Sequence, residues 1–329
     1  MKVAIVGSGP AAYYVAEGLL ARLGGEVEVD LVERLPTPYG LVRSGVAPDH
    51  QTTKQVWRRF AALHADDAVC FHGDVEVGTD VTVDELRALY DAVVLATGAG
   101  IDRRLGIPGE DLPGVYGAAR FVGWYNGHPD DVDPAPVIKG DCAVIIGNGN
   151  VAIDVARVLS RAPAELAASD ISAEAAAAIG GSGLRSCRIV GRRGPMQVGF
   201  SLKELGELGS LSGVSTTADP AQMPAAAETA AAPPPLAKVL RVIEGFARAH
   251  PVDGQKRLHL EFFARPVAIL GDDHVTGVRF ERTVQTAAGW AGTGEHLEHA
   301  CGLVVTCIGY RARPVPGVPY DERRGVLAN

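Results

Sequence analysis

The chain has 329 residues, of which 47% are hydrophobic and 21% are charged, a composition typical of a folded globular protein and not of a disordered one. Its length favours two domains, each with its own core. The formal net charge of −8 gives no electrostatic reason to expect binding to nucleic acid, which needs a basic face.

The N-terminal apolar run is interrupted by Gly7, Gly9 and Pro10, so we expect no signal peptide. Nowhere do about eighteen apolar residues follow one another, and no membrane span is expected. We therefore expect a cytoplasmic protein.

The five cysteines are scattered and form no CxxC pair, which indicates neither a zinc site nor a redox-active dithiol. We interpret them as reduced cytosolic thiols and expect no metal. They are Cys70, Cys142, Cys187, Cys301 and Cys307.

The chain begins with a strand pattern at residues 2–6, a glycine-rich turn, a helical pattern and a second strand at residues 27–32. The turn reads GSGPAA, a GxGxxA fingerprint between a strand and a helix. Gly7 permits the tight turn, Gly9 lets a pyrophosphate approach the backbone, and Ala12 allows close packing of the helix. The helix N-terminus then favours anionic phosphates.

Glu33 follows the second strand, where an acid can accept hydrogen bonds from the adenosine ribose hydroxyls. An acid at this position disfavours a 2′-phosphate. A glycine-rich turn without a ligand is the alternative, but strand, helix and acid together favour a dinucleotide site.

The next elements are an irregular loop with Pro36, Pro38, Gly40 and Gly45, a predicted helix at residues 51–64, and a strand at residues 92–96. The stretch 103–117, rich in glycine and proline, is a plausible crossing between domains.

From Cys142 onward the strand, turn and helix pattern repeats, with a strand at 143–146, the turn GNGN and a helix at 151–159. An alanine-rich helical insertion at 162–179 and a strand at 188–190 follow. Residues 224–235 look like a flexible surface excursion, and β-like runs between 258 and 305 complete the domain.

The strand that follows the second turn ends in Gly191-Arg192-Arg193 and not in an acid. Two guanidinium groups can form bidentate hydrogen bonds with a 2′-phosphate, so this site is predicted to prefer NADP to NAD. A solvated arginine pair is the alternative. An acid-ended and an arginine-ended site in one chain suit FAD and NADPH respectively, and imply hydride transfer between the two cofactors.

The sequence as a whole resembles the adrenodoxin-reductase-like ferredoxin:NADP reductases. The resemblance rests on the following segments: IVGSGPAA (5–12), LPTPYGLVRSGVAPDH (35–50), ATG (96–98), DRRLGIPGEDLPGV (102–115), GNGNVAIDVARVL (147–159), GRRGPMQVGFSLKELGEL (191–208) and IGYRARP (308–314). It implies an α/β fold of two Rossmann-like dinucleotide-binding domains, with the NADP domain inserted into the FAD domain. The expected boundaries are 1–103 for the first part of the FAD domain, 104–312 for the NADP domain and 313–329 for the return to the FAD domain.

The resemblance also implies the residues around each cofactor. With the turn glycines, those near FAD are Gly7, Gly9, Ala12, Glu33, Leu41 and Val75. Those near NADP are Arg103, Gly147, Asn148, Gly149, Asn150, Val151, Arg192, Arg193 and Glu204.

His50 and Glu207 match family positions close to the flavin and nicotinamide, where they would tune hydride transfer or proton supply. From the residues alone, His50 could instead be a helix-entry residue and Glu207 a surface carboxylate.

The family continues beyond the position of Asn329 with a segment, rich in glycine and containing a tryptophan, that contacts the flavin. We therefore expect the FAD domain to lack its C-terminal part in this chain.

The activity implied is electron transfer from NADPH through FAD to a small ferredoxin-type iron–sulfur protein, by a monomeric enzyme. Because such partners are acidic, a local basic patch is needed, and we expect it at Lys238, Arg241 and Arg248 with Lys256 and Arg257 nearby. A merely solvated helix face is the alternative.

Three other functions remain open. A thioredoxin-reductase-like enzyme would need a CxxC pair, and an electron-input subunit of a glutamate-synthase-like system would carry cysteine-rich cluster motifs, neither of which is present. A truncated NADPH-binding fragment is the third.

Overall fold

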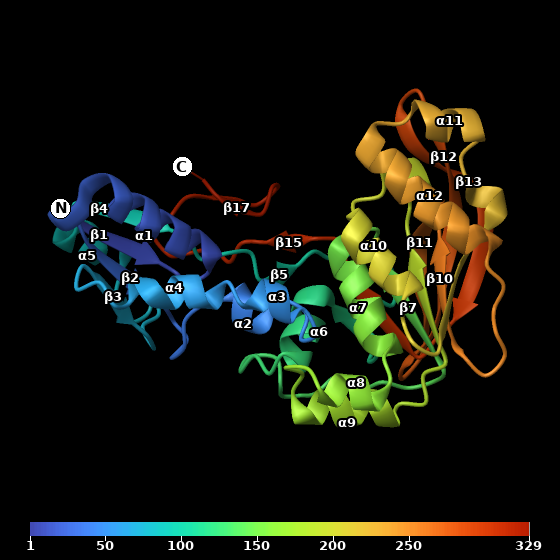
Figure 1. Cartoon of the computed structure of the whole chain (residues 1–329), viewed down its shortest axis with the longest axis horizontal. Helices are drawn as coiled ribbons and strands as arrows, with labels where there is room; N and C mark the ends of the chain where they lie inside the picture. The colour runs from blue at the N-terminus through green and yellow to red at the C-terminus, as the bar shows by residue number, and fades with distance from the viewer. Residues whose placement is uncertain (329) are drawn as a thin grey trace. The chain divides into compact units, whose positions relative to one another are not determined.

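The computed structural model describes residues 1–328, and these form two compact units (Figure 1). One unit comprises Met1–Asp102 together with the chain from Tyr310 onward, and the other comprises Arg103–Gly309. The second unit is thus inserted into the sequence of the first. Asn329, the last residue of the expected segment 313–329, lies outside the described residues.

The first unit contains the following elements. Its strands are β1 (Lys2–Val6), β2 (Glu28–Val32), β3 (Val69–His72), β4 (Ala92–Leu95), β5 (Ile101–Asp102), β15 (Tyr310–Arg311), β16 (Tyr320–Asp321) and β17 (Val326–Leu327). Its helices are α1 (Pro10–Leu23), the short 3₁₀ helix η1 (Gly24–Glu26), α2 (Leu41–Ser44), α3 (Gln51–Lys54), α4 (Trp57–Leu63) and α5 (Val83–Leu89).

A parallel sheet in the order β3-β2-β1-β4 forms the centre of this unit. Ile5 in β1 pairs with Leu31 on one side and Val94 on the other. One face packs against α1 and α4, where Tyr13 stacks on Phe60 at 4.7 Å between ring centroids. The other face packs against α5, so the sheet is covered on both sides, as in a Rossmann unit.

The second unit contains the following elements. Its strands are β6 (Val115–Gly117), β7 (Cys142–Ile146), β8 (Ser186–Val190), β9 (Val214–Ala218), β10 (Lys256–Glu261), β11 (Ala264–Gly271), β12 (Val275–Thr286), β13 (Gly289–Ala300) and β14 (Leu303–Thr306). Its helices are α6 (Ala118–Tyr125), α7 (Asn150–Ser160), α8 (Pro163–Ala167), α9 (Ala173–Gly181), α10 (Leu202–Gly209), α11 (Ala226–Ala231) and α12 (Pro234–Arg248), with 3₁₀ turns η2 (Pro195–Gln197) and η3 (Pro220–Gln222).

A parallel sheet in the order β6-β14-β7-β8-β10-β9 organises the second unit. Helix α7 follows β7 and buries most of its length, which explains its apolar sequence. A separate antiparallel sheet, β11-β12-β13, lies beside the parallel sheet (Figure 1). Phe280 of β12 and Val304 of β14 belong to one buried core between them. The predicted pair of Rossmann-like units, with one inserted into the other, is confirmed.

Three local expectations need adjustment. The helix expected at 51–64 is two helices, α3 and α4. Between them, the amides of Val56 and Arg59 donate to the carbonyl three residues earlier, which tightens the chain around Val56, a β-branched residue. The insertion at 162–179 is likewise two helices, α8 and α9.

The expectation of a flexible excursion at 224–235 is wrong, because these residues include α11 and the start of α12. The carboxylate of Glu228 accepts a hydrogen bond from the Ala225 amide and closes the first turn of α11. The alanines that suggested low complexity are also the strongest helix formers, and Thr229 is buried.

Within residues 1–328, no helix is both long enough and apolar enough to cross a membrane.

Candidate functional site

The first glycine turn joins the carboxyl end of β1 to α1. Gly7 has φ +102°, and a Cβ there would lie 2.4 Å from the Ala96 carbonyl oxygen, so only glycine fits. At Gly9, a Cβ would meet no described heavy atom within 4 Å. Gly9 is also the N-cap of α1 and supplies no side chain to the first amides of the helix. This end of α1 therefore offers open space and amide donors, which fits a pyrophosphate.

The loop before α2 lies against this turn. The Tyr39 amide donates to the Ser8 carbonyl at 2.9 Å, and a Cβ on Gly40 would lie 2.9 Å from the Gly9 Cα. Leu41, the next residue, is 60% exposed. The structure thus brings the loop that leads into Leu41 to the turn, while Ala12 is fully buried.

Glu33 follows β2 directly, and its carboxylate reaches back to the glycine turn. It accepts hydrogen bonds from the Ser8 amide at 2.9 Å, the Ser8 hydroxyl at 2.8 Å and the Leu35 amide at 3.1 Å. The Val75 amide donates to the Glu33 carbonyl, so Val75 lies beside it. The expected FAD-side residues therefore gather at the carboxyl edge of the β1–β2 pair, where open α/β sheets bind ligands.

The second glycine turn joins β7 to α7 in the same way. Gly147 has φ +144°, and a Cβ there would lie 2.2 Å from the Cys307 carbonyl oxygen. Around Gly149, by contrast, a Cβ would find no atom of the described chain within 4 Å, and no side chain of Gly149 caps α7. The N-terminus of α7 is therefore as open as the N-terminus of α1.

The segment before α10 pairs with this second turn. The Gly199 amide donates to the Asn148 carbonyl at 2.7 Å, and the Ser201 amide donates to the Asn150 side-chain oxygen at 2.8 Å. The Asn148 side chain lies where a Cβ on Gly191 would be, so these two residues fit only together. Val151 is the second residue of α7 and is half-buried.

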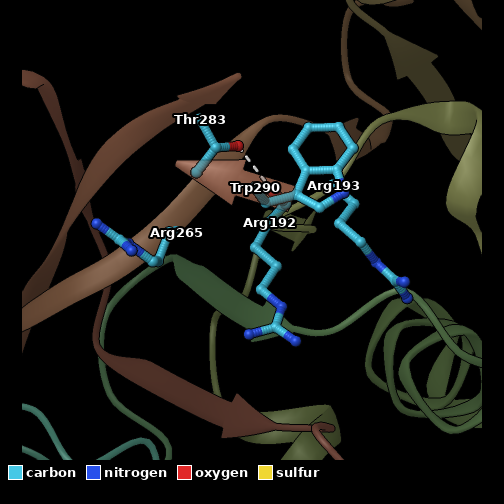
Figure 2. Close-up of a pocket in the computed structure, with 5 residues that line it drawn as sticks. All are labelled: Arg192, Arg193, Arg265, Thr283 and Trp290. Carbon is cyan, nitrogen blue, oxygen red and sulfur yellow. Dashed lines mark hydrogen bonds between the residues drawn. The ribbon is translucent and has the colours of Figure 1, made fainter. Parts of the chain in front are cut away.

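Arg192 and Arg193, just beyond β8, line a pocket of about 300 Å³ (Figure 2). Its other lining residues come from the antiparallel sheet: Arg265 of β11, Thr283 of β12 and Trp290 of β13. The Thr283 hydroxyl donates to the Arg192 carbonyl at 2.7 Å, which fixes the backbone that carries both arginines.

The sequence did not single out Arg265, Thr283 or Trp290. They lie in the β-like runs between 258 and 305, and only the pairing of β11, β12 and β13 brings them together beside Arg192. Arg265 forms an ion pair with Glu281 on β12, and Trp290 packs against Phe263 at 5.8 Å between ring centroids. Among the described lining residues, none is acidic, so the pocket suits an anion.

Helix α10 carries Glu204 and Glu207, and it begins at the N-cap Ser201, whose hydroxyl accepts from the Glu204 amide. Glu207 is 28% exposed and forms an ion pair with the fully buried Arg157 of α7. The sequence did not single out Arg157, although a single cation in the mostly apolar helix 150–160 was the available signal.

His50 and Arg103 stand at the ends of elements. His50 is the half-buried N-cap of α3, and its carbonyl accepts hydrogen bonds from Thr53 and Lys54. Arg103 opens the second unit, with its amide donating to the Gly309 carbonyl at 3.1 Å.

Four of the five expected docking residues are exposed. Lys238, Arg241 and Arg248 are exposed on α12, and Arg257 is exposed on β10. Lys256 differs, because its ammonium group turns inward and donates to the Leu159 carbonyl at 3.2 Å.

A family model described as pyridine nucleotide-disulphide oxidoreductase matches residues 1–175. The chain is 42% identical over 350 residues to the mitochondrial NADPH:adrenodoxin oxidoreductase of Arabidopsis thaliana, covering 100% of this chain and 71% of that protein. It is 43% identical over 338 residues to the NADPH-ferredoxin reductase FprA of Mycobacterium tuberculosis, strain H37Rv, covering 99% of this chain and 74% of that protein.

A solved structure of Mycobacterium tuberculosis FprA in complex with NADPH matches with a TM-score of 0.96 and 42% identity, covering 100% of this chain and 75% of that one. The chain therefore belongs to the family of the NADPH:adrenodoxin oxidoreductases and NADPH-ferredoxin reductases.

Proposed function

We propose that this chain binds FAD at the first glycine turn and NADP(H) at the second, and reduces a ferredoxin-type iron–sulfur protein with electrons from NADPH. One observation carries the proposal. The two turns have the same backbone design, but an acid, Glu33, follows the first and an arginine-lined pocket follows the second. This contrast supports two different dinucleotides, of which only the second has a 2′-phosphate.

At the first turn, the α1 N-terminus would hold the FAD pyrophosphate in the open space at Gly9. Glu33 keeps acceptor capacity beyond its three hydrogen bonds and would accept from ribose hydroxyls. Leu41 and Val75 would supply apolar contacts beside the turn and the acid.

At the second turn, Gly149 leaves the corresponding space for the NADP pyrophosphate, and Asn148, Asn150 and Val151 border it. Arg192 and Arg193 would bind the 2′-phosphate, because Arg265 is partly neutralised by Glu281. Trp290 would stack on the adenine.

When bound, the flavin would accept a hydride from the nicotinamide and release its electrons one at a time to the iron–sulfur protein. Glu207 forms an ion pair with Arg157, so we propose that its carboxylate accepts hydrogen bonds at this position. His50, Arg103 and Glu204 complete the proposed set, His50 and Glu207 as modulators of hydride or proton transfer, and Arg103 and Glu204 as contacts of NADP.

The nucleotide preference is tested by titrating the chain with NADPH and with NADH. We expect Arg192→Ala and Arg193→Ala each to weaken NADPH binding about 10- to 100-fold, the loss of a hydrogen bond to a charged group, and to leave NADH binding nearly unchanged. Arg241→Ala, on the exposed face of α12, is the matched control. Equal losses for both nucleotides would contradict the 2′-phosphate assignment.

The electron-transfer step is tested by an absorbance spectrum of the purified chain, followed by anaerobic addition of NADPH. Bound flavin that bleaches with NADPH, and then reduces a one-electron acceptor, is the expected result. Protein that binds NADPH but holds no flavin after incubation with FAD would contradict the FAD assignment.

For the partner, we propose docking on the exposed cations of α12, Lys238, Arg241 and Arg248, together with the exposed Arg257 of β10. Lys256 is not included, because its ammonium group donates to the Leu159 carbonyl. Electron transfer to a ferredoxin should slow as salt rises, and Arg241→Glu should slow it further at low salt. Salt-insensitive transfer would contradict this surface.

We also propose a cytoplasmic monomer. Cys70, Cys142, Cys187 and Cys301 form no disulfide bond in the described part of the chain, which suits a reducing compartment, although relatives of the chain include mitochondrial proteins. Cell fractionation and the mass in solution measured by light scattering test the two parts.

A further inference from the structure

A cluster of three different metal-binding side chains lies on the first unit, on the sheet face opposite Leu31. Asp30 in β2 pairs directly with Cys70 in the edge strand β3, and His72 follows Cys70 by two residues. Alternate residues of a strand share a face, so Cys70 and His72 project together, with Asp30 beside them. One ligand atom from each of the three lies within 4.8 Å of the other two.

These ligands together select a particular class of ion. A thiolate excludes Mg²⁺ and Ca²⁺, which prefer oxygen, whereas a mixed set of sulfur, imidazole nitrogen and carboxylate oxygen suits Zn²⁺ and similar divalent ions. Cys70 and His72 are exposed, so an ion can enter and water can fill the fourth position. We propose that Asp30, Cys70 and His72 form a surface site for one zinc-class divalent metal ion.

Hydrogen bonds hold the ligand atoms of Asp30 and His72 in place. His72 Nε2 lies 2.8 Å from Asp30 Oδ1, and the Tyr90 hydroxyl donates to Asp30 Oδ2 at 2.7 Å. Such an outer hydrogen bond orients a ligating carboxylate and strengthens its metal binding. Tyr90 therefore leaves Oδ1 directed at His72.

The strands that carry the ligands are rigidly held. β2 pairs with β1 on one side and β3 on the other, and the neighbouring residues Val29, Leu31 and Val69 are buried in the core. Little reorganisation is thus needed on binding. The cysteine spacing gave no sign of this site because Asp30 comes from a different strand, about forty residues earlier than its partners.

The site is independent of the dinucleotide turns. Asp30 projects from the face of the sheet opposite to Val29 and Leu31, which pack with α1. Metal binding should therefore be measurable whether or not FAD or NADPH is bound, and its failure would leave the proposed function untouched.

The test is a titration of the full chain with Co²⁺, a zinc substitute whose bond to a thiolate gives an ultraviolet charge-transfer band in difference spectra. We expect one Co²⁺ per chain, displaced by Zn²⁺, and a rise in the thermal unfolding temperature because the ion binds the folded state. The apparent affinity should fall as the pH is lowered, since the thiol must lose its proton.

The variant Cys70→Ser should abolish the charge-transfer band, and His72→Gln and Asp30→Asn should each weaken binding by about tenfold or more. Cys142→Ser, at a free cysteine of the second unit, is the matched control and should keep the band. Circular dichroism verifies that each variant is folded. Wild-type protein with no cobalt–thiolate band, or a Cys70→Ser variant that retains it, would overturn the proposal.

Discussion

The guanidinium group of Arg157, which is completely buried in α7, forms an ion pair with Glu207 of α10 and a second one with Asp154 at 2.9 Å. Helix α7 begins at the second glycine turn. The Arg157–Glu207 pair therefore fixes the helix that carries Glu204 and Glu207 to the helix whose N-terminus faces the proposed pyrophosphate.

Removing either partner of this pair should have unequal effects on stability. Arg157→Ala leaves two carboxylates without their cation and should lower the free energy of unfolding by about 3–5 kcal/mol. Glu207→Gln keeps a hydrogen-bond acceptor and leaves Asp154 in place, so a smaller loss of about 1–3 kcal/mol is expected. Urea unfolding measures both, with Arg241→Ala expected to stay within about 0.5 kcal/mol. A loss at Arg157 no larger than at Arg241 would refute this role.

The two glycines of the second turn should separate folding from binding. Gly147→Ala places a non-glycine residue at φ +144° with its methyl group against the Cys307 carbonyl. It should therefore lower the free energy of unfolding by about 1–3 kcal/mol. Gly149→Ala meets only open space in the described structure and should unfold normally. Its methyl group occupies the proposed pyrophosphate position, so NADPH affinity should fall about tenfold or more. Calorimetric titration and urea unfolding are the measurements, and normal NADPH affinity in a folded Gly149→Ala variant would contradict the assignment.

Trp290 should contribute to affinity without contributing to the choice between nucleotides. Loss of a stacked base contact costs about 1–3 kcal/mol, so Trp290→Ala should weaken NADPH and NADH alike by about 10- to 100-fold. Trp290→Phe should retain most of the affinity, and Trp57→Ala, in the first unit, should change neither. Quenching of protein fluorescence is unsuitable for tryptophan variants, so binding is measured by calorimetry. A selective loss of NADPH would show that Trp290 acts through the 2′-phosphate instead.

The buried carboxylate of Glu261 should make stability depend on acid pH. Burial opposes its ionisation, but the hydrogen bond and charge of His299 and the charges of Arg188 and Arg282 outweigh burial and lower the pKa of Glu261 from 4.5 to about 2. Because the pKa is lower in the folded state, the stabilisation is fully present above about pH 4.5 and is lost as the pH falls towards about 2.

The variant Glu261→Gln should therefore be less stable at neutral pH by roughly 3 kcal/mol and should lose less further stability between those two pH values. Glu298→Gln is the matched control, because Glu298 is 52% exposed and pairs with Arg279 at the surface. Urea midpoints measured across the acid range compare the two. Parallel curves for wild-type and Glu261→Gln protein would disprove the assignment.

Much of the architecture followed from local pattern. The local pattern predicted the strand at residues 2–6, the glycine turn and the helix after it. It also predicted their repetition from Cys142, because each unit is built from consecutive residues. For the same reason the local pattern alone places Glu33 and Arg192 at the carboxyl ends of their strands.

Contacts that depend on the pairing of distant strands could not be predicted from the local pattern. Trp290 and Arg265 reach the pocket of Arg192 only through the register of β11, β12 and β13, and Asp30 meets Cys70 only through the pairing of β2 with β3.

The sequence by itself determined the two dinucleotide units and the chemical contrast between their ends, because a glycine turn and the residue after the next strand belong to one contiguous supersecondary motif. The tertiary structure alone decided which further side chains surround each end. Those contacts join residues far apart in the chain. Their geometry depends on strand register and buried packing, which the periodicity of the local sequence does not reveal.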